Sequence, residues 1–187
     1  MIQNVAMDLH GWYNERKTRN GVENLDRIRL FRASSLDTSG VGLWTDYPYA
    51  GTLPMDAEII GWARPEVIAF CFLPGQEERV FLLDLAAAQN DQVRSVAANF
   101  TDFLGLLVAC GTVNGIFRLL FDRNLFPSEE PQPLTKKQQS ILRAISNTFA
   151  PSNISDPAAY LAAQPPFPGI GEGPPAPPKK RRKRKHH

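Results

Sequence analysis

The sequence predicts an α+β domain, with a mostly antiparallel central sheet packed against three or four helices and a disordered, proline-rich and basic C-terminal tail. Short, almost wholly apolar runs in the first half have the composition of buried strands, and apolar residues in the second half recur at helical spacing. The chain has 187 residues, of which 43% are hydrophobic, so it can bury one core and has little length for a second domain.

The first sixty residues give weaker signals. Residues 1–13 suit a short helix, residues 27–31 alternate charged and apolar side chains as a strand does, and residues 41–44 suit an edge strand. Residues 46–53 contain two tyrosines, a proline and a glycine, which predict an aromatic loop before another short strand at residues 59–62.

The firmest strand predictions are residues 66–73 and 79–85. Both segments are apolar at nearly every position, so we expect them to be central in the sheet and covered by helices. The five residues 74–78 between them have the length of a hairpin loop.

Three helices are predicted from their caps. Asn99 is a suitable N-cap for an apolar helix that Gly111 ends, and Thr112 can cap the helix that follows. Thr135 with Gln138 forms a capping box, which opens a third helix.

The composition changes near the end of the chain. Asp156, followed by proline, favours the start of a short last helix. Seven of the fourteen residues 165–178 are proline, which predicts an extended segment that builds no core, and residues 179–185 are all Lys or Arg. We therefore expect one domain at residues 1–163 and a tail at residues 164–187.

Charge is divided between the body and the tail. The net charge of the whole chain is +2, but residues 1–178, which precede the basic run, have a net charge of −5. An acidic body is poorly suited to binding nucleic acid across its own face, whereas the basic tail is well suited to it.

Catalytic and metal-binding patterns are sparse. His10 is the one histidine before the last two residues, and no HExxH, CxxC or HxH spacing occurs. Gly169, Gly171 and Gly173 imitate part of a phosphate-binding loop, but they lie among prolines and follow no strand. We expect no enzyme activity, no cofactor and no metal.

Cys71 and Cys110 belong to apolar segments and form no CxxC pair, so we expect both to be buried free thiols. The N-terminus is polar, and the apolar runs are far shorter than the ~20 residues that span a bilayer. These features predict a reducing intracellular compartment and no membrane partner: the cytoplasm, or the nucleus for a eukaryotic or viral source.

Candidate partner-binding residues are aromatic and acidic. Tryptophan and tyrosine near loops are favoured in protein interfaces, although Trp62 fits a position covering the sheet edge better. Two carboxylates two residues apart favour a solvated edge or an interface over acid–base catalysis. The candidates are Trp44, Tyr47, Tyr49, Asp56 and Glu58.

Several features in order are similar to a known family. A Gly-Trp pair stands near the start of the core, two apolar strands follow, and the pattern A-x-x-F-x-x-F-L opens a helix after a short polar segment. In this sequence these are Gly61, Trp62, the VFLLDL run at residues 80–85, Ala97, Phe100, Phe103 and Leu104. Residues 50–163 thereby resemble the Smi1/Knr4-like (SUKH) superfamily and its uncharacterised bacterial members.

The resemblance implies an α+β domain without enzymatic activity that binds another protein. Many bacterial members are immunity proteins that neutralise toxins, often nucleases, and fungal members are signalling scaffolds. The acidic body would suit a basic toxin, because complementary fields steer association.

The basic run leaves an alternative function open. It could be a nuclear localisation signal read by an importin, a sequence-independent tether to nucleic acid or an anionic surface, or a solubilising tail. Its residues are Lys179, Lys180, Arg181, Arg182, Lys183, Arg184 and Lys185. The alternative is thus a nucleic-acid-associated or nuclear protein.

Overall fold

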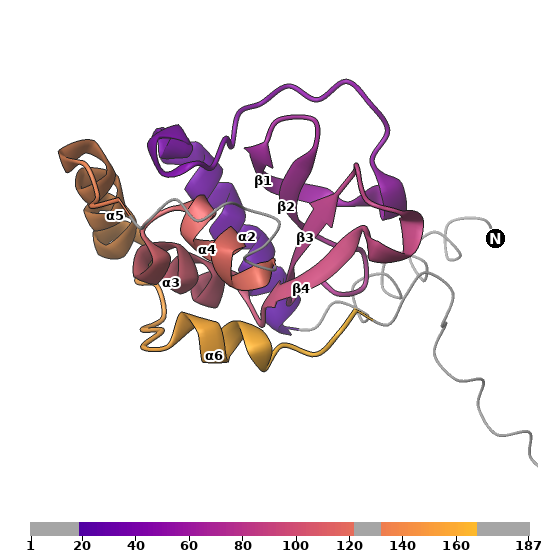
Figure 1. The fold of residues 1–187 in the computed structure, drawn as a ribbon. Helices are drawn as coiled ribbons and strands as arrows, with labels where there is room; N and C mark the ends of the chain where they lie inside the picture. Colours follow the sequence, from indigo (N-terminus) through magenta and orange to yellow (C-terminus); the bar gives the residue numbers. More distant parts are fainter. Residues whose placement is uncertain (1–18, 122–131, 168–187) are drawn as a thin grey trace, which may run out of the picture.

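The computed structural model describes residues 19–121 and 132–167 and confirms the α+β class. Four antiparallel strands form one sheet in the order β1-β2-β3-β4, with the helices gathered on one side of it (Figure 1). The strands are β1 (Glu58–Arg64), β2 (Ile68–Phe72), β3 (Val80–Asp84) and β4 (Val93–Ala97). The helices are α2 (Arg19–Ala33), α3 (Phe100–Cys110), α4 (Val113–Leu120), α5 (Lys136–Phe149) and α6 (Pro157–Ala162), with short 3-10 turns η1 (Thr38–Val41), η2 (Pro54–Asp56) and η3 (Gln89–Asp91).

The inner face of the sheet packs against the helices. The Phe70 ring lies 4.8 Å from that of Phe103 on α3, and the Phe72 ring lies 6.4 Å from that of Phe100. Phe31 of α2 meets the same Phe100 ring edge-on at 5.6 Å. Large buried aromatic rings therefore join the sheet and the helices into one core.

The outer face of the sheet carries a second, smaller core. Its buried members are Ala57, Cys71, Leu73, Phe81, Leu83 and Val93. Partly buried side chains cover them, and these come from the loop around η2, from the strand ends and from Phe167, whose ring meets Phe81 at 5.6 Å. The expectation that helices cover the central strands is therefore right for the inner face and wrong for the outer face.

Two predictions in the first hundred residues need correction, and one strand was missed. The strand predicted at residues 27–31 lies inside α2, because Leu25, Ile28 and Phe31 recur at helical spacing and are buried. Residues 41–44 form no strand, since η1 ends at Val41 and only Trp44 bridges to the sheet. Strand β4 was not predicted, because its exposed Arg94 interrupts the apolar pattern.

The predicted helix caps are confirmed. The Asn99 side chain accepts a hydrogen bond from the Asp102 amide at 2.8 Å, and that of Thr112 accepts one from the Gly115 amide at 3.2 Å. At α5 the reciprocal bonds of the Thr135–Gln138 capping box are both present. The positions of α3, α4 and α5 thus follow from local sequence signals.

Helix α6 is fastened to the start of α3 by a small polar network. The Tyr160 hydroxyl donates to Asp102 Oδ2 at 2.6 Å and accepts a hydrogen bond from the Ala98 amide at 2.9 Å. The Ser152 hydroxyl donates to the other Asp102 oxygen at 2.5 Å. Partial burial, together with the neighbouring Asp102 carboxylate, raises the pKa of Tyr160 to about 12.

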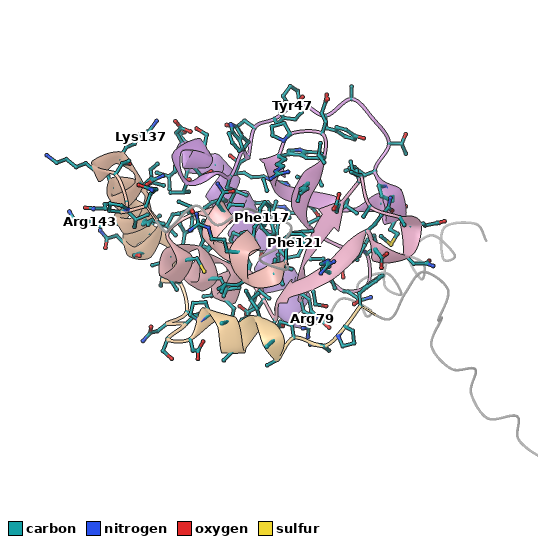
Figure 2. All side chains as sticks on the ribbon, in the orientation of Figure 1. Tyr47, Arg79, Phe117, Phe121, Lys137 and Arg143 are labelled. Atoms are coloured by element: carbon teal, nitrogen blue, oxygen red, sulfur yellow. The ribbon has the colours of Figure 1, made fainter. Side chains whose placement is uncertain are left out.

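The chain then continues from α6 towards the sheet (Figure 1). Arg79, labelled beside the end of α6 in Figure 2, donates a hydrogen bond to Gln164 Oε1 at 2.8 Å. With the Phe167–Phe81 contact, packed residues extend four positions past the boundary predicted at residue 163.

Candidate protein-binding surface

Trp44 lies at the end of a row of residues that crosses the outer face of the sheet. Its amide donates to the Trp62 carbonyl at 2.8 Å, and the Trp62 amide donates back at 2.7 Å. Residues opposed in this way share a face. The pairings of the sheet continue the row as Trp44, Trp62, Ala69, Leu83 and Val93.

Gly61 allows this arrangement. A Cβ atom at Gly61 would lie 2.7 Å from the Leu43 side chain and 3.3 Å from the Trp44 carbonyl oxygen. A glycine here therefore lets the segment containing residues 43–44 approach the edge of β1.

The predicted aromatic residues lie together but differ in exposure. The Tyr47 and Tyr49 rings pack on Trp62 at centroid distances of 6.0 and 5.0 Å, and Trp62 is only 2% exposed. Figure 2 shows Tyr47 on the loop above β1. Trp44 is 39% exposed, so it is the aromatic side chain of this group that a partner can contact most directly.

A hollow of about 400 Å³ lies beside Trp44. Hydroxyl and carboxylate groups line much of it, including Ser39, Asp37 and Asp46. Asp37 accepts hydrogen bonds from the amide and hydroxyl of Ser39, which lower its pKa, and Lys137 Nζ approaches its other oxygen at 3.7 Å. We call the residues Asp37, Ser39, Trp44, Asp46 and Tyr47 the Trp44 surface.

The sequence around the Trp44 surface is strongly acidic. Residues 34–91 contain nine carboxylates and two arginines, a net charge of −7. One of these carboxylates, Glu66, is the main reason why the Tyr47 pKa is raised. The Trp44 surface therefore combines an exposed indole with two exposed carboxylates, Asp37 and Asp46, of which Asp37 is approached by Lys137. An indole beside carboxylates favours cationic partners.

Asp56 and Glu58 are not part of this surface. Asp56 is exposed in η2, and Glu58 at the start of β1 accepts a hydrogen bond from Arg32 of α2 at 3.4 Å. Glu58 precedes Trp62 by four residues, about 13 Å along a strand. The structure thus brings the three predicted aromatics together and places the two predicted carboxylates at the other end of β1.

Sequence reasoning did not select Asp37, Ser39 or Asp46. The excess of carboxylates over residues 34–91 was a usable signal, but it does not show which of them lie beside Trp44. The side chains of Asp37 and Ser39 meet because Asp37 caps η1, a 3-10 turn that the sequence analysis did not identify.

The remaining predictions concern the cysteines, metal sites and residues outside the described ranges. Cys71 and Cys110 are both free, but only Cys71 is buried as predicted, whereas Cys110 is partly exposed. Burial raises the pKa of the Cys71 thiol to about 12 and partial burial raises that of Cys110 to about 11. Within residues 19–121 and 132–167, no cluster of three or more His, Cys, Asp or Glu could hold a metal ion. His10, the three tail glycines, the helix expected at residues 1–13 and the basic run lie outside the described residues.

Over the described ranges, no single helix combines the length and hydropathy of a membrane span, and α3 with α4 does so only as a pair bent by 98°. The similarity of residues 50–163 to the Smi1/Knr4-like superfamily stays a prediction from sequence. No family model, no curated protein and no solved structure matches this chain.

Proposed function

We propose that this protein is a non-catalytic binding module that recognises another protein through the Trp44 surface. The exposure of Trp44 carries the proposal, because every other member of its row across the sheet is buried. Tryptophan is enriched among the residues that dominate binding energy, whereas leucine, the residue type of the more exposed Leu30, is under-represented.

The charge of the surface indicates the class of partner. With a net charge of −7 over residues 34–91, a basic protein would be steered towards it. A basic toxin neutralised by an immunity protein is such a partner, and the resemblance to the SUKH superfamily agrees with that assignment. The Trp44 indole would form the central contact, and Asp37 and Asp46 would meet cationic side chains at its rim.

A capture experiment with matched variants tests this proposal. Full-length wild type, Trp44→Ala and Leu30→Ala are used as bait in lysate of the source organism, at low and high salt. We expect wild type and Leu30→Ala to retain a common protein in high salt, and Trp44→Ala to bind it at least tenfold more weakly. Equal binding of the identified partner by Trp44→Ala would contradict the proposal.

A second candidate function rests on the seven consecutive basic residues 179–185. These could tether the protein to nucleic acid without sequence preference. If all seven contact duplex DNA, the logarithm of the binding constant should fall with the logarithm of salt concentration with a slope of about −6. A variant with all seven replaced by serine should lose this binding, and its absence in wild type at low salt would reject the candidate.

A further inference from the structure

We propose that the Trp44 surface is the docking site of this chain's own C-terminal segment, residues 168–185. The inference rests on the proposed function, since it takes the Trp44 surface to be a protein-binding site. The inference names the segment as the occupant of the Trp44 surface when no other protein is bound, and as the element that regulates access to it.

The segment starts on the same face of the sheet as Trp44. Phe167, the last residue described, packs edge-on against Phe81 of β3 at 5.6 Å. Phe81 is opposed by Cys71, and Cys71 by Ile59, so these side chains form a second row beside the row that ends at Trp44. The chain therefore leaves Phe167 above the outer face.

The distance to be crossed is short compared with the length of chain. Trp44 lies three strand spacings from β3, about 15 Å across the sheet, and Trp62 lies three residues beyond Ile59, about 10 Å along it. Together these place the Trp44 backbone about 18 Å from that of Phe81. Residues 168–178 can extend over about 34 Å as polyproline, so Lys179 can reach the hollow.

The chemistry of the segment matches that of the surface. Proline-rich segments bind aromatic-lined surfaces with little loss of conformational entropy, and Trp44 and Tyr47 supply two such rings. The segment carries seven positive charges at residues 179–185, and the surface presents the exposed carboxylates Asp37 and Asp46. Lys and Arg side chains can then contact Asp46 and the indole face, which adds a cation–π contribution.

The tether makes this contact intramolecular. A covalent connection that can span the distance raises the effective concentration of the segment at the surface, so a weak interaction suffices for occupancy. An external protein must displace the segment from the Trp44 surface before it binds. Nucleic acid that takes up the basic residues would expose the same surface.

The test compares two full-length proteins by NMR. One is wild type, and in the other the seven basic residues at 179–185 are replaced by serine. The indole N–H resonance of Trp44 is assigned through its loss in Trp44→Phe. We expect this resonance to differ between the two proteins at low salt and to coincide at about 500 mM salt, where screening releases the segment. The methyl resonances of Leu30, on α2, serve as the control and should not change.

Two results would overturn the proposal. Identical Trp44 resonances in both proteins at low salt would show that the segment does not reach the surface. A difference that grows with protein concentration would show that a second copy supplies the segment. If duplex DNA is added to wild type, the resonance should move to the position found in the serine variant, and failure to move while DNA binds would also contradict the proposal.

The capture experiment separates this inference from the proposed function. If both hold, the serine variant binds the captured protein about tenfold more tightly than wild type, because the surface is no longer occupied. If only the proposed function holds, Trp44→Ala still abolishes capture, while the serine variant changes neither the Trp44 resonance nor the affinity. If only the segment contact exists, the resonance differs but Trp44→Ala captures as much as wild type.

Discussion

The two faces of the sheet are buried by different means. On the inner face, Phe70 and Phe72 meet aromatic residues of regular helices whose N-termini are capped by their own side chains. On the outer face, Phe81 and its neighbours lie under an irregular loop and under Phe167, which follows the last helix. The inner layer is therefore the source of most of the stability. The outer cover, made of the loop around η2 and Phe167, can open locally at a lower cost in free energy.

The largest expected effect concerns the inner face. Phe103 is completely buried and its ring packs against those of Phe70 and Phe100. Phe103→Ala should lower the free energy of unfolding by about 3–5 kcal/mol, because it removes apolar contacts and leaves a cavity. Urea unfolding of the full chain measures this. A loss below about 1 kcal/mol would break the distinction between the two faces.

The next effect concerns Tyr160, which fastens α6 and thereby the route to the outer face. Tyr160→Phe keeps the ring but removes the hydrogen bonds to Asp102 and from the Ala98 amide, at a cost of about 1–2 kcal/mol. The pKa of Tyr160 is about 12 in the folded protein, above its value of 10.0 in model compounds. Its contribution is thus complete below pH 10 and is lost as the pH rises towards 12.

The pH dependence of this stability difference serves as the control for the role of Tyr160. The difference in unfolding free energy between wild type and Tyr160→Phe should be constant from neutral pH to about pH 9.5 and should then shrink. Urea unfolding across this range would contradict the assignment if the difference stayed constant up to pH 11.

Phe167→Ala should have a smaller effect on stability. Phe167 is only partly buried, and its recorded ring partner is Phe81. We expect a loss of about 1 kcal/mol in urea unfolding, roughly half of what burying a full aromatic side chain contributes. A loss as large as that of Phe103→Ala would mean that the outer cover is as integral to the fold as the helices are.

The smallest effect is kinetic and reports directly on the outer cover. Cys71 lies beneath this cover with a pKa of about 12, whereas Cys110 is partly exposed at the end of α3 with a pKa of about 11. In wild type, a thiol reagent should modify Cys110 before Cys71, because Cys110 is more exposed and a larger fraction of it is thiolate at a given pH. Phe167→Ala should speed the modification of Cys71 several-fold and leave Cys110 unchanged.

The same contrast explains which features could be predicted from sequence. The caps at Asn99, Thr112 and Thr135 are local signals, so the helices that cover the inner face were placed correctly. The contact of Phe167 with Phe81 joins residues far apart in the chain, and hydrophobic periodicity in the sequence does not predict such a contact. The outer cover was therefore not predicted.

The candidate surface was predicted only in part for a related reason. Trp44, Tyr47 and Tyr49 all looked like loop aromatics, and the sequence does not show that both tyrosines pack on Trp62 while Trp44 stays exposed. Asp56 and Glu58 were selected because two carboxylates two residues apart suit an interface. The strand between Glu58 and Trp62 separates them in space from the three aromatics.

The irregular edge of β1 has a consequence for the behaviour of the protein at high concentration. Its register with β2 shifts twice, between Ile59 and Gly61 and between Trp62 and Arg64, and Trp44 already uses the outward backbone groups of Trp62. Bulged strands twist away from flat pairing, and an occupied edge offers few free groups to another chain. Despite its apolar strands, the sheet is a poorer template for amyloid-like growth around Trp62, where the bulges and the Trp44 bridge lie.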